Sequence, residues 1–89
     1  MRVEKSARTV FTPLEDGTGV LLNVDNLLYY TINRTGVALW RQIETSEFSM
    51  VEDLVDRVCE RFEIDRDSAR RETSAFLERL KELKILRLV

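Results

Sequence analysis

The sequence GVLLNVDNLLYYTINRTGVALW, residues 19–40, decides the fold class of this chain. Two apolar runs, residues 20–22 and 27–32, are separated by the polar segment 24–26, a pattern typical of two short strands joined by a turn. Asn33 follows the second run where a helix N-cap belongs, because its side chain can accept free backbone N–H groups of the first helical turn. The stretch therefore predicts two strands that lead directly into a helix.

Another strand is predicted before this stretch. Residues 8–14 contain threonine, valine and phenylalanine side chains, which suit a half-buried pleated surface. Pro13 cannot donate a hydrogen bond to a neighbouring strand, so this strand is expected to lie at an edge of the sheet or to end near Pro13. Residues 15–19, EDGTG, indicate a turn. Short connections join antiparallel neighbours, so we expect a meander of three antiparallel strands.

After Asn33, apolar residues recur at the three- and four-residue intervals of amphipathic helices. Ser49 and Glu52 fit a capping box at the start of one helix, and Asp65 suits the N-cap of the next. The apolar residues 85–89 are expected to extend along the body of the domain. A three-stranded antiparallel sheet with helices on one face predicts an α+β fold with the outline of a winged helix-turn-helix. The three predicted helices cover residues 35–44, 50–62 and 66–83.

Composition narrows the range of partners. At 89 residues the chain is expected to form a single domain, residues 1–89. Its formal net charge of −2 gives no electrostatic reason to expect nucleic acid or an anionic membrane as partner. No apolar run approaches the roughly 20 residues that cross a bilayer, and the N-terminus lacks the hydrophobic centre of a signal peptide. Cys59 is the only cysteine, which excludes an intramolecular disulfide and indicates a reducing, cytoplasmic setting.

Two common features of catalytic sites are missing. The chain contains no histidine, the commonest general base and zinc ligand. Its three glycines are isolated, and none precedes a Lys-Ser or Lys-Thr pair as in a phosphate-binding loop. The carboxylates alternate with Arg and Lys at helical spacing, as on a solvated face. We therefore predict no catalytic residues, no metal site and no cofactor, and we expect that the protein is not an enzyme.

Several motifs, taken in order, resemble the PqqD-like family. They are the strand GVLLN, the strand end YYTIN, the helix start TGVALW, the second-helix segment SMVEDLVDRVCERFEID and the closing FLERLKELKIL. The resemblance covers about residues 10–88, although the family often has glycine where Lys84 stands. It implies a small winged-helix-like domain that binds the leader segment of a ribosomally made precursor peptide and presents the peptide to a modifying enzyme.

The resemblance also implies where the leader peptide lies. It is expected to add a strand beside the third strand, residues 28–32, in a cleft walled by the third helix, residues 67–84. The paired tyrosines Tyr29 and Tyr30 differ from members of the pyrroloquinoline-quinone pathway. The sequence therefore leaves the identity of the partner enzyme open. A radical-SAM enzyme, a lasso-peptide protease or cyclase, and another peptide-modifying enzyme fit equally well.

Within the strand and helix that the resemblance implies, side-chain periodicity distinguishes the candidate binding residues. Because alternate strand residues share a face, Tyr29 and Thr31 point away from Ile32, which we assign to the core. Tyr29 is then the better candidate for contact with a guest peptide, with an ordinary half-exposed tyrosine as the alternative. On the third helix, one flank of the apolar stripe combines a hydrophobe with cations, although these cations could instead pair with nearby carboxylates. The predicted peptide-binding residues are Leu28, Tyr29, Tyr30, Thr31, Ile32, Arg70, Thr73, Ser74, Leu77 and Lys81.

Two other functions remain open from the sequence. In a winged-helix DNA-binding regulator, Arg66, Arg70 and Arg71 would contact phosphates or guanine edges. The acidic balance of the chain and the interleaved Asp67 and Glu72 count against this role. A structural subunit or chaperone that contacts only another protein is the third possibility.

Overall fold

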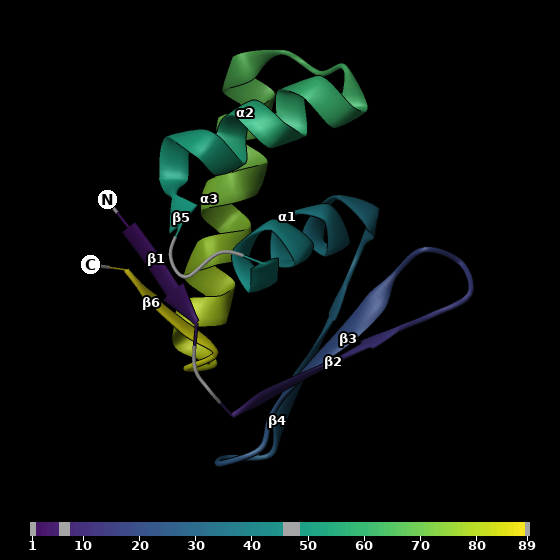
Figure 1. The fold of residues 1–89 in the computed structure, drawn as a ribbon, viewed down its shortest axis with the longest axis vertical. Coiled ribbons are helices and arrows are strands. Elements are labelled where there is room, and N and C mark those ends of the chain that lie inside the picture. Colours follow the sequence, from purple (N-terminus) through teal and green to yellow (C-terminus); the bar gives the residue numbers. More distant parts are fainter. Residues whose placement is uncertain (1, 6–7, 46–48, 89) are drawn as a thin grey trace.

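The computed structural model describes residues 2–5, 8–45 and 49–88. The polypeptide forms two small sheets and three helices, with α1 between the larger sheet and α2 (Figure 1). The elements in chain order are β1 (Arg2–Lys5), β2 (Thr9–Pro13), β3 (Gly19–Asn23), β4 (Leu28–Ile32), α1 (Arg34–Thr45), β5 (Ser49–Met50), α2 (Val51–Phe62), α3 (Arg66–Glu82) and β6 (Leu86–Leu88).

The larger sheet is the predicted meander. Its strands lie in the order β2-β3-β4, and both pairs are antiparallel. Pro13 lies opposite Gly19 at the end of β2, where a missing backbone donor costs least because β2 is an edge strand. The inner face of the sheet contributes Leu21 and Ile32 to the core, and the outer face carries exposed Val10 and Tyr29. The predicted α+β fold, with three antiparallel strands followed by three helices, is confirmed.

The start of α1 is fixed by a side-chain cap and by a close contact with the sheet. Asn33 Oδ1 accepts a hydrogen bond from the Gly36 N–H at 2.9 Å, which confirms the predicted N-cap. A Cβ atom at Gly36 would lie 2.9 Å from Ile32 Cβ and 3.1 Å from Phe76 Cε1. Only glycine therefore lets α1 approach both β4 and α3 this closely, and Trp40 is buried farther along the helix.

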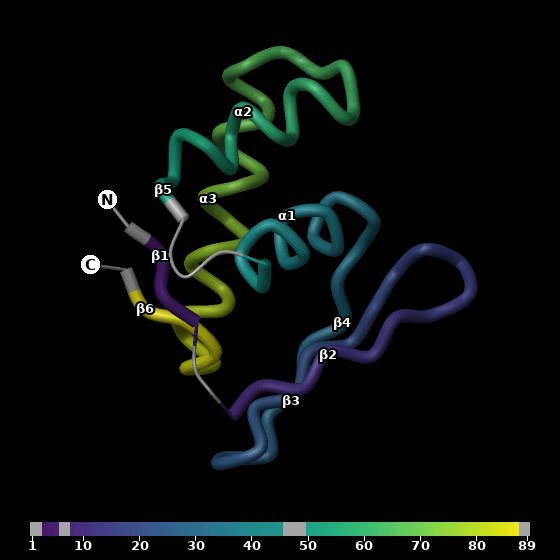
Figure 2. Tube along the Cα trace, viewed as in Figure 1, coloured from purple at the N-terminus to yellow at the C-terminus, as the bar shows by residue number. Residues whose placement is uncertain are grey.

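A second sheet, with the order β5-β1-β6, was not predicted. β1 pairs antiparallel with β6 from Val3↔Leu88 to Lys5↔Leu86, and its other edge pairs with β5. Figure 2 shows β1 and β6 side by side, although they come from opposite ends of the chain. The expected apolar extension at the C-terminus is confirmed for β6, and Val89 lies outside the described residues.

The polar Asn23 ties the larger sheet to the C-terminal end of α3. Its side chain is only 3% exposed, and Asn23 Nδ2 donates to the carbonyls of Leu83 at 3.0 Å and Lys84 at 3.2 Å. The same side chain accepts a hydrogen bond from the Asp25 N–H in the β3–β4 turn. The three hydrogen bonds of this buried amide offset the cost of removing it from water, and they fix the position of β3 relative to α3.

The start of α2 differs from the prediction. Met50, not Ser49, occupies the N-cap, and no side-chain hydrogen bond caps the helix. The predicted capping box is therefore wrong, because Glu52 instead accepts hydrogen bonds from Arg66 and Arg70 of α3. The next cap was predicted correctly: the Asp65 carboxylate accepts the Ser68 N–H at 3.0 Å.

Arginine–carboxylate pairs join α2 to α3. Arg66 contacts Glu52 at 2.8 Å and Asp56 at 2.6 Å, and Arg70 shares the Glu52 carboxylate. Hydrogen bonds from Arg70 first and Arg66 second hold the pKa of Glu52 below its usual range. α2 packs on α3 and α1, and α1 lies between α2 and the larger sheet, where it contacts β4 (Figure 1).

The core is one cluster shared by both sheets and all three helices. α2 contributes Leu54, Val55 and Val58, as the apolar pattern predicted. Within the described ranges, no helix has the length and apolar character that a membrane span requires. The other large buried side chains, besides those named above, are Val3, Leu39, Ile43, Phe76, Leu77, Leu80, Ile85 and Leu86.

Replacing Lys84 by glycine is expected to stabilise the protein. Lys84 has φ of 59°, a left-handed conformation that costs a side-chain-bearing residue about 1 kcal/mol or more. It follows α3 in a Schellman motif, in which the Ile85 N–H donates to the Leu80 carbonyl at 2.9 Å. Lys84→Gly should raise the free energy of unfolding by about 1 kcal/mol in urea denaturation, because glycine adopts this conformation without strain.

The matched control for this change is Lys81→Gly. Lys81 is exposed in the last turns of α3, where glycine should lower the free energy of unfolding by about 1 kcal/mol. Equal effects of the two substitutions would contradict a specific role for the backbone conformation at Lys84.

The Glu52→Gln variant is expected to lose stability at neutral pH but not in acid. Because the folded state lowers the pKa of Glu52, its ion pairs stabilise the protein above the pKa of the unfolded chain. This contribution is lost as the pH falls through the folded-state pKa. Thermal unfolding should therefore show a lower Tm for Glu52→Gln at pH 7, and the gap should close in acid.

The control for the pH series is Glu78→Gln. Glu78 is an exposed carboxyl of α3 that forms no ion pair with another described residue. Its substitution should change the Tm little at either pH. If the difference in Tm between Glu52→Gln and the parent stayed constant with pH, charge would not be what holds α2 against α3.

Candidate functional site

One edge of the larger sheet is open. Among the described residues, β4 pairs with β3 alone, from Gly19↔Ile32 to Asn23↔Leu28. In an antiparallel strand, alternate residues direct their N–H and C=O groups away from the paired neighbour. β4 therefore presents unpaired backbone donors and acceptors along its free edge, which can pair with an added strand.

A cleft of about 310 Å³ borders this edge. Its apolar part is formed by Ile32 of β4, Leu39 of α1, and Ala75 and Phe76 of α3. Phe76 and Ile32 are buried, whereas Ala75 is exposed at the rim. The close approach of α1 at Gly36 brings these three elements to the same cleft.

Charged groups lie at the rim of the cleft. Glu72 lines it from α3 and is exposed. About two turns farther along α3, Arg79 places its guanidinium carbon 5.5 Å from the centroid of the Tyr30 ring, a distance typical of a cation–π contact. Arg79 also pairs with Glu82 at 3.3 Å. The site thus combines an apolar floor with a carboxylate near one part of the rim and a guanidinium near another.

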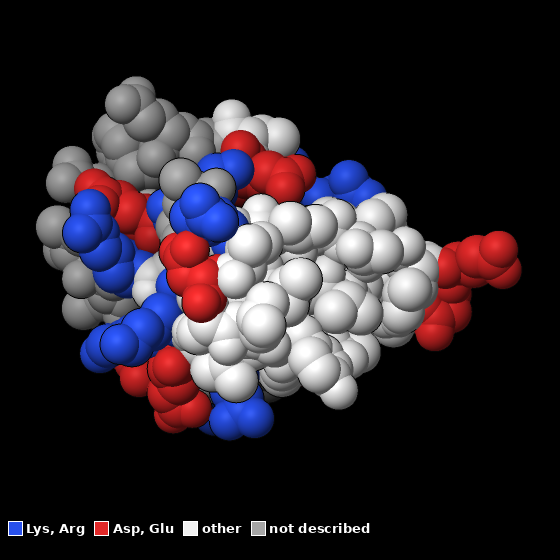
Figure 3. Space-filling model, turned by 90° about the horizontal axis from the view of Figure 1, so that it is seen from below, with Lys and Arg blue, Asp and Glu red and all other residues white. Residues whose placement is uncertain are grey.

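The other face of β4 is exposed and uncharged. Tyr29, which is 70% exposed, lies across from Leu22, and Leu22 lies across from Val10. Figure 3, viewed from below, shows a broad uncharged area over this sheet, bordered by acidic and basic side chains. Tyr29 and the exposed Thr31 face away from buried Ile32, as the alternation predicted.

The structure divides the predicted binding residues into two groups. The five residues of β4 lie along the open edge, and three of them, Tyr30, Thr31 and Ile32, line the cleft. On α3, by contrast, Arg70 is turned toward α2 and pairs with Glu52.

The remaining predicted residues of α3 are also absent from the cleft lining. Thr73 and Leu77 are core residues with 0% and 2% exposure, and neither lines the cleft. Ser74 is exposed beside Arg70. Lys81, by helical spacing, shares the flank of Arg70 and Ser74. The predicted flank of α3 therefore lies on the α2 side of the helix and not beside β4.

The sequence could not show which flank of α3 lies beside β4, for a physical reason. Both flanks of α3 border the same apolar stripe, and periodicity identifies the stripe but not the neighbour that each flank meets. Glu72, Ala75 and Arg79 face the sheet. The one local signal was the small side chain of Ala75 beside the stripe, which leaves space for another chain.

The site has the chemistry of a binding surface. The described residues include no group of three or more His, Cys, Asp or Glu side chains arranged to hold a metal ion. Cys59, the free thiol, is half-buried on α2 and packs against the core away from the cleft. An open strand edge beside an apolar cleft is suited to hold an extended peptide segment.

Two solved structures share this fold. One is TbiB1 in complex with the TbiA(beta) leader peptide, with a TM-score of 0.83, 23% sequence identity, and coverage of 97% of this chain and 96% of that one. The other is lasso peptide synthetase B1 complexed with the leader peptide, with a TM-score of 0.77, 19% identity, and coverage of 97% and 98%. At these identities the likeness establishes the fold alone.

Sequence comparison identifies a family for this chain but no individual curated relative. No curated protein matches the chain significantly. The family model described as coenzyme PQQ synthesis protein D (PqqD) matches residues 18–86, which include β3, β4, all three helices and the start of β6. The earlier resemblance is thereby confirmed, and the chain belongs to the PqqD family.

Proposed function

We propose that this domain, residues 1–89, binds the leader segment of a ribosomally synthesised precursor peptide and presents the peptide to a modifying enzyme. The observation that carries the proposal is the open edge of β4 beside an apolar cleft. Membership of the PqqD family supports it, as do the two similar folds solved with leader peptides.

In this proposal the leader pairs with β4 as an additional antiparallel or parallel strand. Backbone hydrogen bonds contribute only about 0.5 to 1.5 kcal/mol each, and association costs several kcal/mol of lost freedom. Side chains must therefore supply the affinity and the sequence preference. Alternate residues of the guest face the cleft, where Ile32, Ala75 and Phe76 would contact apolar side chains.

The charged rim orients the guest. A basic leader residue would pair with the exposed Glu72, and an acidic one would reach Arg79 beside Tyr30. The residues of the guest that face away from the cleft would lie next to Tyr29 on the outer face of the sheet. The proposed site is thus Leu28–Ile32 together with Glu72, Ala75, Phe76 and Arg79.

The proposed role is binding without catalysis, with chemistry supplied by a separate enzyme. That enzyme would be a radical-SAM enzyme, a lasso-peptide protease or cyclase, or another enzyme that modifies peptides. A DNA-binding role is disfavoured because Arg66 and Arg70 are already paired with Glu52 and Asp56. These carboxylates would repel a phosphate backbone that approached the start of α3.

Filling the cleft should abolish leader binding. Ala75 is exposed at the cleft rim, so Ala75→Trp should place a large ring in the cleft without disturbing the core. With a cognate leader identified from the neighbouring genes, isothermal titration calorimetry should show binding weakened about tenfold or more, which corresponds to about 1.4 kcal/mol.

The adjacent position gives a matched control. Ser74→Trp adds the same ring to the flank of α3 beside Arg70, outside the cleft, and should leave the affinity within about twofold. Circular dichroism checks that both variants are folded. If Ser74→Trp blocked binding and Ala75→Trp did not, the leader would lie on the Arg70 flank and the proposed cleft would be rejected.

A further inference from the structure

A second cleft, here called the arginine groove, lies between α1, α2 and the β2–β3 turn. Its volume is about 590 Å³, and Arg34, Arg41, Arg57 and Arg61 contribute to its lining. The half-buried Phe62 contributes an apolar surface between these cations. The groove therefore combines positive charge with an apolar contact surface.

Three of the four groove arginines form no ion pair in the part of the chain that the structure describes. No ion pair within the described residues joins Arg41, Arg57 or Arg61 to an Asp or Glu side chain. By contrast, the carboxylates on the other side of α2 are engaged by arginines of α3. These three guanidinium groups are thus left without an ion-paired carboxylate, although Asp53, Asp56 and Glu60 adjoin Arg57.

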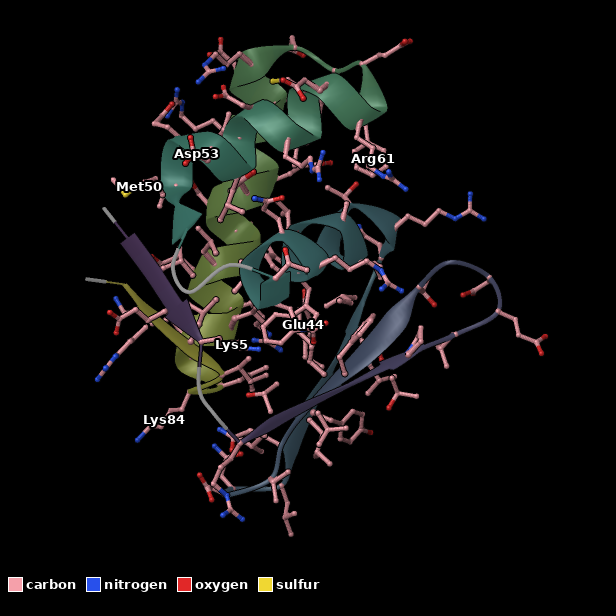
Figure 4. All side chains as sticks on the ribbon, in the orientation of Figure 1. Lys5, Glu44, Met50, Asp53, Arg61 and Lys84 are labelled. Atoms are coloured by element: carbon pink, nitrogen blue, oxygen red, sulfur yellow. The ribbon has the colours of Figure 1, made fainter. Side chains whose placement is uncertain are left out.

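Other contacts hold the groove arginines in place. The guanidinium carbon of Arg41 lies 5.4 Å from the centroid of the Phe11 ring. Arg34 Nε donates to the Asp16 carbonyl at 3.0 Å, which anchors it over the β2–β3 turn. Arg61 extends from the end of α2 toward α1 (Figure 4). The cations are therefore partly ordered before any ligand binds, which lowers the entropic cost of binding.

The groove and the cleft beside β4 occupy opposite sides of α1. Gly36 and Leu39 of this helix line the cleft, whereas Arg34, Ala38 and Arg41 line the groove. The helical repeat separates these two sets of residues. A strand added to β4 would consequently leave the arginine groove uncovered.

We infer that the arginine groove binds an acidic segment of a partner protein, in which an apolar residue is flanked by Asp or Glu. The inference rests on the proposed function, since the partner would be the protein to which the leader is presented. Guanidinium groups pair with carboxylates through two parallel hydrogen bonds, and the four arginines offer several such sites. The apolar residue of the segment would contact Phe62.

The surroundings of the groove favour a short acidic protein segment over a nucleic acid. Asp53, Asp56 and Glu60 adjoin Arg57 on α2, and Asp53 lies at the far end of that helix from Arg61 (Figure 4). A continuous phosphate backbone would approach these carboxylates and be repelled. A folded protein carries acidic residues locally and can place neutral or basic residues opposite the carboxylates.

A defined peptide tests the inference. The probe is a synthetic peptide with one phenylalanine flanked on each side by a pair of glutamates, and its all-glutamine analogue is the ligand control. Nuclear magnetic resonance should show shifts of the Nε–Hε signals of Arg41, Arg57 and Arg61 with the glutamate peptide at low salt. The shifts should be absent with the glutamine peptide and should weaken as salt is raised.

Charge reversal supplies the protein control. Arg41→Glu combined with Arg57→Glu should weaken binding of the glutamate peptide about tenfold or more, and Arg41→Gln with Arg57→Gln should weaken it less. Arg71→Glu, at an exposed position of α3 outside both surfaces, should leave binding within about twofold. Absence of binding, or equal loss with Arg71→Glu, overturns the inference.

Two further titrations separate the possible failures. A short DNA duplex that shifts the same arginine signals at a lower concentration than the glutamate peptide would overturn the assignment to a protein segment. The leader should bind the doubly reversed variant as it binds the parent, because the cleft lies across α1. If the leader did not bind the parent protein, the proposed function would be rejected. Binding of the glutamate peptide to the groove would still be tested independently.

Discussion

The close contact of α1 with β4 and α3 at Gly36 is the constraint on which both candidate surfaces depend. A single added Cβ would lie 2.9 Å from Ile32 and 3.1 Å from Phe76, so the contact exists only because this position lacks a side chain. It sets the floor of the cleft beside β4, and it fixes which side of α1 remains for the arginine groove. The asymmetry of one helix therefore separates a peptide cleft from a cationic groove.

Charge is divided along α2 in a way that local sequence does not reveal. Glu52 and Asp56 face α3 and are neutralised by its arginines, whereas Arg57 and Arg61 face α1. Exposed ion pairs contribute little stability individually. Their larger effect is on which arginines attract an external anion. The arginines of α3 are paired and attract it weakly, whereas the arginines of the groove keep their attraction.

Local signals were sufficient for the meander and for two helix starts. Asn33 and Asp65 cap their helices through contacts within three residues, which a sequence pattern can identify. The second sheet could not be predicted, because β1 has one buried apolar residue, Val3, and its partners lie near positions 50 and 88. The flank of α3 that lies beside β4 could not be predicted either, since only tertiary packing shows that Ala75, and not Ser74, lines the cleft.

An added strand on β4 would have two chemically different sides. Its inward side chains would meet the apolar cleft, where their fit can determine which leader binds. Its outward side chains would lie beside the uncharged sheet face with Val10, Leu22 and Tyr29 (Figure 3). Because the pleat alternates strictly, every second guest residue remains accessible to another protein. A domain of this form can select a peptide with one side of its backbone and leave the other side open to an enzyme.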